Sequence, residues 1–369
     1  MERWAIPGGA IAVVKDGRLV LARGYGYADV DAKEVVAPDA LFRIASVSKP
    51  ITAVAALRLA EQGRLDLDAK VFALLPQLKP PASATNLDPR LADITVRQLL
   101  SHLGGWDRDR SFDPMFRSTE IAAALGTTAP ASAEDVIRYM LGRSLDFGPG
   151  ARYAYSNFGY AVLGRVIEQA SGQRYHTHVA EQVLRPMGIT RMRLGRSLLR
   201  DRAVGEVRYY DANAQTTSVF PSGGQVPWPY GGFHLEAMDA HGGWIASAID
   251  LARFITAVDG MATRPDLLRA ASIELMTARP STVWDGSAFH YAAGWLVRPQ
   301  QGNWWHNGSL PGTSALIVRA GNGLAWAVLF NGRFMIPGST FEQEVDPAVW
   351  QAVSQVTTWP AHDLFSQYP

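Results

Sequence analysis

Strand-like patterns occupy the two ends of this 369-residue chain, and a long stretch of helical patterns separates them. Residues 11–27 are expected to form a hairpin, because the turn pair Asp16-Gly17 divides two apolar segments. The strand pattern returns after residue 290 in four short apolar runs, at 292–297, 303–306, 314–318 and 324–330. This order predicts a discontinuous α/β domain whose two pieces flank a mostly helical domain.

Helical spacing of apolar residues begins at Ser46 and continues to Gly63, where glycine predicts the end of a helix. Pro347 is expected at the start of the last helix or as a break within it. We expect an α/β (α+β) domain over residues 1–63 and 245–369, and a mostly helical domain over residues 64–244. Further helices are expected at 96–102, 159–172, 248–258 and 341–358, and loops at 80–89 and 215–232.

The composition favours a folded globular protein, since 47% of the residues are hydrophobic and 19% are charged. Lysine and arginine together number 35 against 34 acidic residues, so the net charge of +1 predicts no basic stripe and no nucleic-acid partner. The absence of cysteine excludes disulfides, thiolate metal sites and a cysteine nucleophile.

The first residues, from Met1 to Pro7, show no basic segment followed by a long apolar core. No run of 18 or more apolar residues occurs, so no membrane span is expected. We therefore expect a cytoplasmic protein from the sequence as written, or a periplasmic or secreted one if a leader was removed. The sequence does not predict an oligomeric state.

The first strong helix begins at Ser46-Val47-Ser48-Lys49. Lys49 lies one helical turn after Ser46, so its amine can approach the Ser46 hydroxyl. The apolar residues that follow would bury the lysine stem, and burial favours the neutral amine that acts as a base. A helix N-terminus also supplies backbone N–H groups for an oxyanion. Ser46 is therefore a candidate nucleophile, with a simple helix cap as the alternative.

Two further motifs carry groups suited to acyl transfer. Tyr155-Ser156-Asn157 offers a phenol that can relay protons and an amide that can hold a substrate carbonyl, or else a loop anchor and a helix cap. His306-Asn307-Gly308 ends a short apolar run, and its glycine permits close approach of a ligand to an edge strand. The N–H of Ser309 beyond this glycine is a candidate oxyanion donor.

These three motifs, in this order and at these separations, resemble the serine β-lactamase and penicillin-binding-protein superfamily. The branch that the chain resembles most comprises class C β-lactamases, D,D-peptidases and family VIII carboxylesterases. The resemblance extends over nearly the whole chain and implies a β-lactamase/transpeptidase-like fold, an antiparallel sheet flanked by helices with a mostly helical second domain. Supporting phrases stand at residues 42–45, 99–105, 158–164, 242–254 and 306–312.

The resemblance implies an acyl-enzyme mechanism on a small-molecule ester or amide. Ser46 would attack the carbonyl, while Lys49 and Tyr155 share the base and acid roles in an order that the sequence leaves open. Asn157 would hold the acyl side of the substrate, and the N–H groups of Ser46 and Ser309 would form the oxyanion hole. Family members need no metal, and no cofactor is expected here because the sequence lacks zinc-binding and phosphate-binding motifs.

The third motif departs from the Lys-Thr-Gly that β-lactamases of this branch usually carry. His306, Asn307 and Gly308 are expected to contact substrate, but imidazole is mostly neutral at pH 7 because its ordinary pKa is about 6.5. The motif therefore lacks a permanent charge that could bind the carboxylate of an antibiotic. Since only neutral His306 would assist substrate binding, kcat/KM for a neutral ester is expected to decline as the pH drops below about 6.5. Trp304 and Trp305 flank the motif, and one of them is expected to give the cleft an aromatic wall that favours neutral esters.

Three functions remain after these observations. The first is a carboxylesterase acting on small or medium acyl esters. The second is a D,D-peptidase or D-aminopeptidase with weak β-lactam binding, which the histidine of the third motif favours. The third is a catalytically silent relative that binds a ligand. Fold alone does not decide among the three.

Overall fold

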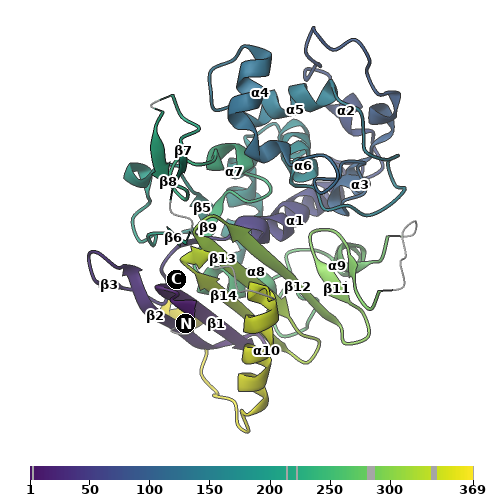
Figure 1. Ribbon diagram of the computed structural model, residues 1–369. Coiled ribbons are helices and arrows are strands. Elements are labelled where there is room, and N and C mark those ends of the chain that lie inside the picture. Colours follow the sequence, from purple (N-terminus) through teal and green to yellow (C-terminus); the bar gives the residue numbers. More distant parts are fainter. Residues whose placement is uncertain (2–3, 213–214, 222, 281–286, 334–338, 369) are drawn as a thin grey trace.

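The computed structural model describes residues 1, 4–212, 215–221, 223–280, 287–333 and 339–368. Its centre is an eight-stranded antiparallel sheet with the strand order β10-β11-β12-β13-β14-β1-β2-β3 (Figure 1). The sheet therefore joins strands from the two ends of the sequence. These strands are β1 (Gly8–Lys15), β2 (Arg18–Asp29), β3 (Glu34–Val35), β10 (His290–Tyr291), β11 (Leu296–Arg298), β12 (Asn303–Leu310), β13 (Thr313–Arg319) and β14 (Leu324–Phe330).

Alternation along the central strands sends side chains to two separate apolar cores. Ala12 and Ala327, which are partners across β1 and β14, belong to the large core, where α8 (Ala248–Thr256) packs on the sheet. Val13 and Trp326, the next pair, belong to a smaller core beneath α10 (Phe341–Ser354). Alanines on the first face leave room for α8 to lie close to the strands.

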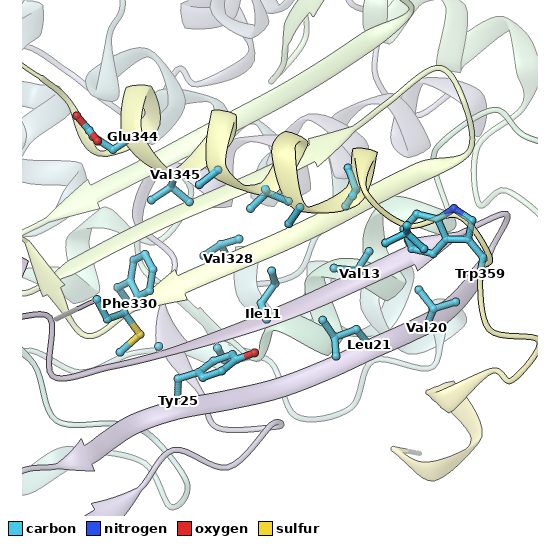
Figure 2. Close-up of a pocket in the computed structure, with 18 of the residues that line it drawn as sticks. Ile11, Val13, Val20, Leu21, Tyr25, Val328, Phe330, Glu344, Val345 and Trp359 are labelled. Carbon is cyan, nitrogen blue, oxygen red and sulfur yellow. The ribbon is translucent and has the colours of Figure 1, made fainter. Parts of the chain in front are cut away.

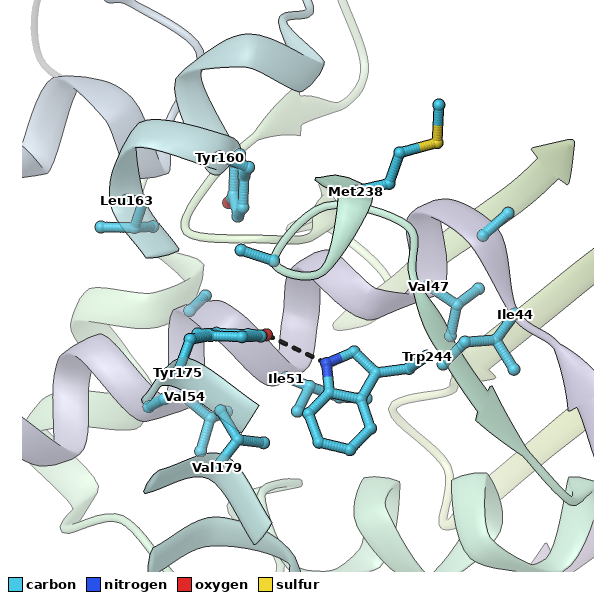
Figure 3. Packing of buried hydrophobic residues seen from close by; sticks show 14 of the residues in the cluster. Ile44, Val47, Ile51, Val54, Tyr160, Leu163, Tyr175, Val179, Met238 and Trp244 are labelled. Atoms are coloured by element: carbon cyan, nitrogen blue, oxygen red, sulfur yellow. Dashed lines mark hydrogen bonds between the residues drawn. The ribbon is translucent and has the colours of Figure 1, made fainter. Parts of the chain in front are cut away.

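Helix α1 (Ser48–Glu61) runs through the interior between the sheet and the helical part of the molecule. Its residues from Ser48 to Leu57 are all buried, as expected for a helix that is enclosed on all sides rather than amphipathic. Figure 3 shows its neighbours, which include Tyr160 of α6 (Asn157–Ser171) and Tyr175 of α7 (Tyr175–Val179). The Trp244 indole donates a hydrogen bond of 3.1 Å to the Tyr175 hydroxyl, so this polar pair is satisfied within the core.

Short elements complete the chain. The helices are α2 (Val71–Leu74), α3 (Val96–Leu100), α4 (Ser118–Leu125), α5 (Ala133–Leu141) and α9 (Ala270–Thr277). Three small sheets pair β4 (Phe42–Arg43) and β5 (Arg193–Leu194) with β9 (Trp244–Ala246), β6 (Tyr210–Asp211) with β15 (Gly332–Arg333), and β7 (Gln215–Thr217) with β8 (Gln225–Pro227). The single turns that matter below are η2 (Ala45–Val47) and η4 (Pro114–Phe116).

The predicted fold class is confirmed, as an antiparallel sheet flanked by helices. The hairpin of β1 and β2 and the helices α3, α6 and α8 lie where the sequence places them, within a few residues. Strand β12 extends to Leu310, and α10 ends at Ser354 with Pro347 inside it. The proposed division into domains 1–63 plus 245–369 and 64–244 stays a prediction.

Two expectations are wrong. The run 292–297 was expected as one strand, but the chain turns there between β10 and β11. The cause is Gly294, which has a φ of +83° and lies so close to α1 that a Cβ would be 3.0 Å from the Lys49 carbonyl oxygen. The segment 215–232 was expected as loop, but β7 and β8 pair within it, from Gln215↔Pro227 to Thr217↔Gln225.

A groove of about 680 Å³ lies between α10 and the face of the sheet that carries the smaller core. Figure 2 shows its floor, formed by side chains of β1, β2 and β14 such as Ile11, Leu21 and Val328, and its wall at Val345. None of the sequence-predicted site residues lines it. Throughout the described ranges, every helix is too short or too polar to cross a membrane.

Candidate active site

Ser46 lies on a strained turn at the entrance to α1. Strand β4 leads into the single turn η2, and α1 begins directly after it, so Ser46 precedes the helix by two residues. The residue before it, Ala45, has a φ of +47°, a left-handed conformation that costs a non-glycine residue on the order of 1 kcal/mol. Such strain is typical of functional sites, where surrounding packing fixes an unfavourable backbone. Here it presents a half-buried serine hydroxyl at a bend.

Lys49 is fully buried, and its amine contacts three oxygen atoms. Its Nζ lies 3.1 Å from Ser46 Oγ, 2.8 Å from Asn157 Oδ1 and 2.9 Å from the His241 carbonyl oxygen. Burial disfavours the ammonium and lowers the pKa of Lys49 well below its ordinary range. The amide and the carbonyl each need an N–H, and a neutral amine has two. The lone pair of the neutral amine is then directed at the Ser46 hydroxyl.

Tyr155 is the second group on the nucleophile. Its hydroxyl donates a hydrogen bond of 2.7 Å to Ser46 Oγ. Desolvation raises the pKa of Tyr155 far above its ordinary value, so the phenol keeps its proton at neutral pH. The Arg108 guanidinium lies over the Tyr155 ring, 4.6 Å from its centroid. Ser46 Oγ thus accepts a hydrogen bond from the Tyr155 phenol, and the Ser46 hydroxyl can donate its own proton to Lys49.

Asn157 opens α6, and the residue before it fixes its position. The Ser156 hydroxyl caps the helix by accepting from the Gly159 N–H at 3.1 Å, while the Ser156 N–H donates to His102 Nδ1 at 3.1 Å. With its oxygen occupied by Lys49, the Asn157 amide donates through Nδ2 to Asp113 Oδ2 at 2.6 Å. Asn157 therefore bridges the buried base and a carboxylate.

His306 lies behind Tyr155 in the protein interior. Its side chain is 2% exposed, with Nε2 3.0 Å from the Tyr291 hydroxyl and Nδ1 2.6 Å from the Asn307 carbonyl oxygen. Burial lowers the pKa of His306 to about 3, so it is neutral at ordinary pH and the loss of activity expected below about pH 6.5 is not attributable to it. His102 packs between Tyr155 and Tyr291, with ring centroids 4.4 and 4.3 Å away.

Gly308 brings β12 against the nucleophile turn. A Cβ at this position would lie 2.2 Å from the Ile44 carbonyl oxygen and 3.2 Å from the Ser46 nitrogen, so only glycine fits. Strand β11 pairs with β12 at residues 303–305 alone, which leaves the rest of this edge to the η2 turn. Ser309 follows on the strand, and its exposed position beside the turn agrees with the predicted oxyanion donor. That role of Ser46 and Ser309 stays a prediction, as does substrate contact by the half-buried Asn307.

The expected aromatic wall is not at this site. Trp304 is buried against Trp295 in the large core, with ring centroids 5.9 Å apart. Trp305 packs with the smaller core on the other face of the sheet. Alternation therefore directs neither indole at Ser46. In the described part of the chain, no three histidine or acidic side chains gather as metal ligands do.

Five residues of the site escaped the sequence analysis: Arg108, Asp113, His102, His241 and Tyr291. His102 stands in a phrase that supported the resemblance, but nothing in that phrase assigns it a contact. Asp113 precedes Pro114, which is typical of a residue that caps a helix. It does cap η4, since its Oδ1 accepts from the Met115 N–H at 3.1 Å. Its second bond, to Asn157, joins residues 44 positions apart and has no local signal.

A family model described as Beta-lactamase matches residues 1–345. Protein flp of Staphylococcus aureus (strain COL) is 27% identical over 320 residues, which is 86% of this chain and 58% of that protein. The chain thus spans less than two thirds of the length of that relative.

Solved structures repeat the fold over almost the whole chain. D-amino acid amidase from Ochrobactrum anthropi SV3, complexed with D-phenylalanine, superposes with a TM-score of 0.71 at 23% identity, covering 95% of this chain and 94% of that one. EstCE1, a hydrolase with promiscuous acyltransferase activity, superposes with a TM-score of 0.71 at 21% identity, covering 95% and 93%. At these identities the likeness is one of fold.

Proposed function

Since this chain belongs to the Beta-lactamase family, we propose that it is a serine hydrolase that works through an acyl-enzyme, with Ser46 as the nucleophile. The observation that supports this most strongly is the pair of bonds at Ser46 Oγ, one to the buried Lys49 amine and one from the Tyr155 phenol. A nucleophile held between a base and an acid is the arrangement that acyl transfer requires.

The directions of the two pKa shifts support one distribution of the base and acid roles. Lys49, whose pKa is lowered by burial, takes the proton of Ser46 as its oxygen attacks the carbonyl carbon. Tyr155, whose pKa is raised, gives its proton to the leaving oxygen or nitrogen as the bond to the acyl carbon breaks. The proton held by Lys49 then restores the phenol, so acylation is proton-neutral overall. Water attacks the resulting ester and releases the acid and Ser46.

Backbone N–H groups stabilise the oxyanion in this proposal. Gly308 holds β12 against the η2 turn, and the N–H groups of Ser46 and Ser309 are the expected donors. Donors fixed by the backbone need no rearrangement when negative charge develops on the carbonyl oxygen, which is why such sites accelerate acyl transfer.

The substrate class that we propose first is a small or medium acyl ester. The third motif carries no permanent positive charge, because His306 is neutral and directed at Tyr291 rather than at a substrate carboxylate. EstCE1, which shares the fold, is a hydrolase with promiscuous acyltransferase activity. The same absence of charge argues against efficient turnover of carboxylated β-lactams.

A D-peptidase or D-aminopeptidase is the second candidate. The structure of D-amino acid amidase shares the fold over 95% of this chain. Amide hydrolysis needs a proton for the leaving nitrogen, and Tyr155 is positioned to supply one. A silent binding relative, the third function considered, has little support, because the nucleophile, base and acid are all present and bonded to one another.

The test is hydrolysis of p-nitrophenyl butyrate at pH 7.5 by the wild-type protein and by Ser46→Ala, with Ser354→Ala at the exposed end of α10 as the matched control. We expect Ser46→Ala to lose about a thousandfold in kcat/KM and Ser354→Ala to lose none. Equal rates in the wild type and Ser46→Ala would contradict the nucleophile assignment. If neither protein hydrolysed the ester but the wild type hydrolysed D-amino-acid p-nitroanilides, the D,D-peptidase or D-aminopeptidase would replace the carboxylesterase as the first candidate.

A further inference from the structure

Two side chains of opposite charge flank the reacting groups, and both come from the segment between α3 and α4. Arg108 lies over the Tyr155 ring at 4.6 Å, and its side chain is 41% exposed. Asp113 is half-buried and accepts from the Asn157 amide at 2.6 Å. Arg108 is therefore one residue away from Ser46, through Tyr155, and Asp113 is two residues away, through Asn157 and Lys49.

The Asp113 carboxylate is held in place without being neutralised. Its Oδ1 accepts from the Met115 N–H and its Oδ2 from the Asn157 amide, so each oxygen has one neutral donor. Among the residues that the structure describes, no lysine, arginine or histidine lies within 4.0 Å of it. Each oxygen keeps a further lone pair, and a fixed carboxylate with free acceptor capacity is suited to bind a cation.

Arg108 is likewise available. The acid nearest to it is Asp109, at 3.8 Å, and the Asp109 side chain is 89% exposed, so this pair is weak. Stacking on Tyr155 holds the guanidinium plane beside the phenol that protonates the leaving group. A planar guanidinium in that position can bind a carboxylate through two parallel hydrogen bonds.

With the roles proposed above, the two charges fall on opposite sides of the scissile bond. Asn157 lies on the acyl side in the proposed mechanism, and Asp113 is bonded to it, whereas Arg108 is stacked on the residue that serves the leaving group. We propose that the enzyme acts on aminoacyl compounds with a free α-ammonium, which Asp113 binds, and that Arg108 binds a carboxylate on the leaving group. A short peptide with a free N-terminus carries both charges.

This inference rests on the proposed acyl-enzyme function and narrows its substrate class toward the second candidate. The α-ammonium is one carbon away from the carbonyl that Ser46 attacks, and Asp113 is linked to Ser46 through Asn157 and Lys49. Asp113 and Arg108 act as specificity residues, because neither takes part in the transfer of protons.

The first test compares alanine p-nitroanilide, as each enantiomer, with propionyl p-nitroanilide, which lacks only the amine. We expect the enantiomer that is turned over faster to exceed the propionyl compound at least tenfold in kcat/KM at pH 7. Because an α-amino group has an ordinary pKa of about 8, this advantage should decline as the pH rises past that value. The decline needs no variant and is therefore independent of folding defects.

Variants assign the effect to one carboxylate. Asp113→Asn should lower the ratio of the two kcat/KM values at least tenfold, and Asp113→Glu should restore part of it. Glu120→Gln on α4 removes a charge of the same sign from the exposed pair with Arg117 and should leave the ratio unchanged.

The leaving group is tested by comparing alanyl p-aminobenzoate, whose leaving group carries a carboxylate, with alanyl anilide, whose leaving group does not. We expect a higher kcat/KM for the p-aminobenzoate. Arg108→Gln should remove this difference, and Arg117→Gln should not.

The outcomes separate the two proposals. Ser46-dependent hydrolysis of both anilides with a ratio that Asp113→Asn does not alter would overturn this inference and leave the acyl-enzyme function intact. Failure of every substrate, together with no labelling of Ser46 by a fluorophosphonate probe, would overturn the proposed function itself. A ratio that depends on Asp113 and falls with the ionisation of the amine supports both.

Discussion

Lys49 is the proposed base of this site, and burial lowers its pKa well below the ordinary range. Its amine is buried beside an amide oxygen and a backbone carbonyl oxygen, and both are satisfied by the two N–H groups of the neutral form. The Ser-x-x-Lys spacing was enough to predict the Ser46–Lys49 contact, since the turn that carries Ser46 leads directly into the helix that carries Lys49. The contacts of Lys49 with Asn157 and His241 bridge 108 and 192 positions, and only the tertiary structure reveals them.

The pH profile follows from Lys49 and Tyr155. Only the neutral lysine accepts the Ser46 proton, so kcat/KM for a neutral ester should rise as the pH increases through the lowered pKa of Lys49. It should stay high at alkaline pH, because the pKa of Tyr155 is raised and its phenol keeps its proton. A stopped-assay profile of p-nitrophenyl butyrate hydrolysis measures both limbs.

The control for this profile is His306→Asn. The pKa of His306 is lowered to about 3, so replacing this residue should reduce the rate without moving the acid limb. An acid limb that disappeared in His306→Asn would show that the histidine, rather than Lys49, sets it.

At the scale of elements, the first turn of α6 ties the proton donor to the amide bridge. Tyr155 and Asn157 flank Ser156, whose hydroxyl caps the helix and whose N–H meets His102. Positions 155 and 157 were predicted to carry chemistry, or else to anchor a loop and cap a helix. In the structure Ser156 rather than Asn157 caps α6, and Tyr155 and Asn157 both belong to the network around Ser46. His102 comes from beyond α3, so no local pattern could have placed it here.

Removing this cap should affect stability and catalysis together. Ser156→Ala should lower the free energy of unfolding by about 1 kcal/mol and also reduce kcat/KM, because the helix start that positions Asn157 frays. Ser247→Ala removes the equivalent cap of α8, where Ser247 accepts from the Asp250 N–H at 3.0 Å and its hydroxyl is bonded to Asp250 rather than to the network around Ser46. It should cost a similar stability and leave kcat/KM unchanged. Urea unfolding and steady-state assays on the two variants test this, and equal catalytic losses would contradict it.

The same scale explains where strand prediction failed. Residues 292–297 are apolar enough for a strand, but close packing of Gly294 on α1 forces the chain to turn. That constraint comes from a helix more than 230 positions earlier, so periodicity within the segment cannot report it. By contrast, β13 and β14 have neighbours close in sequence and were predicted nearly to their ends.

At the scale of the molecule, the central sheet separates two cores with different tasks. The large core holds α1, α6 and the site, whereas the smaller one lies between the sheet and α10. Sequence order predicted that the two ends of the chain form one sheet. It did not predict the charged residues of the 101–117 segment that reach the site, because long-range packing brings them there.

A substitution in the smaller core should therefore alter stability alone. Trp350 of α10 packs edge to face on Trp326 of β14 with ring centroids 4.7 Å apart. Trp350→Ala should lower the free energy of unfolding by about 2 kcal/mol and leave kcat/KM for a neutral ester unchanged at temperatures where the variant is folded. Thermal melts followed by circular dichroism, with assays at 25 °C, provide the measurement. A loss of activity in the folded variant would show that the two cores are coupled through the sheet.

The pairing of β1 with β14 has a consequence for biosynthesis. Val13 pairs with Trp326, which follows it by roughly 300 residues. A ribosome that adds about 5–20 residues per second needs about 15–60 s to make that length. During this interval the early hairpin has emerged without its central neighbour β14; α8 is made only late in the interval, and α10 follows β14. Contacts so distant in sequence are also slow to form once the chain is complete. The sheet therefore cannot close before β14 has been made, and until then the nascent hairpin lacks its central neighbour.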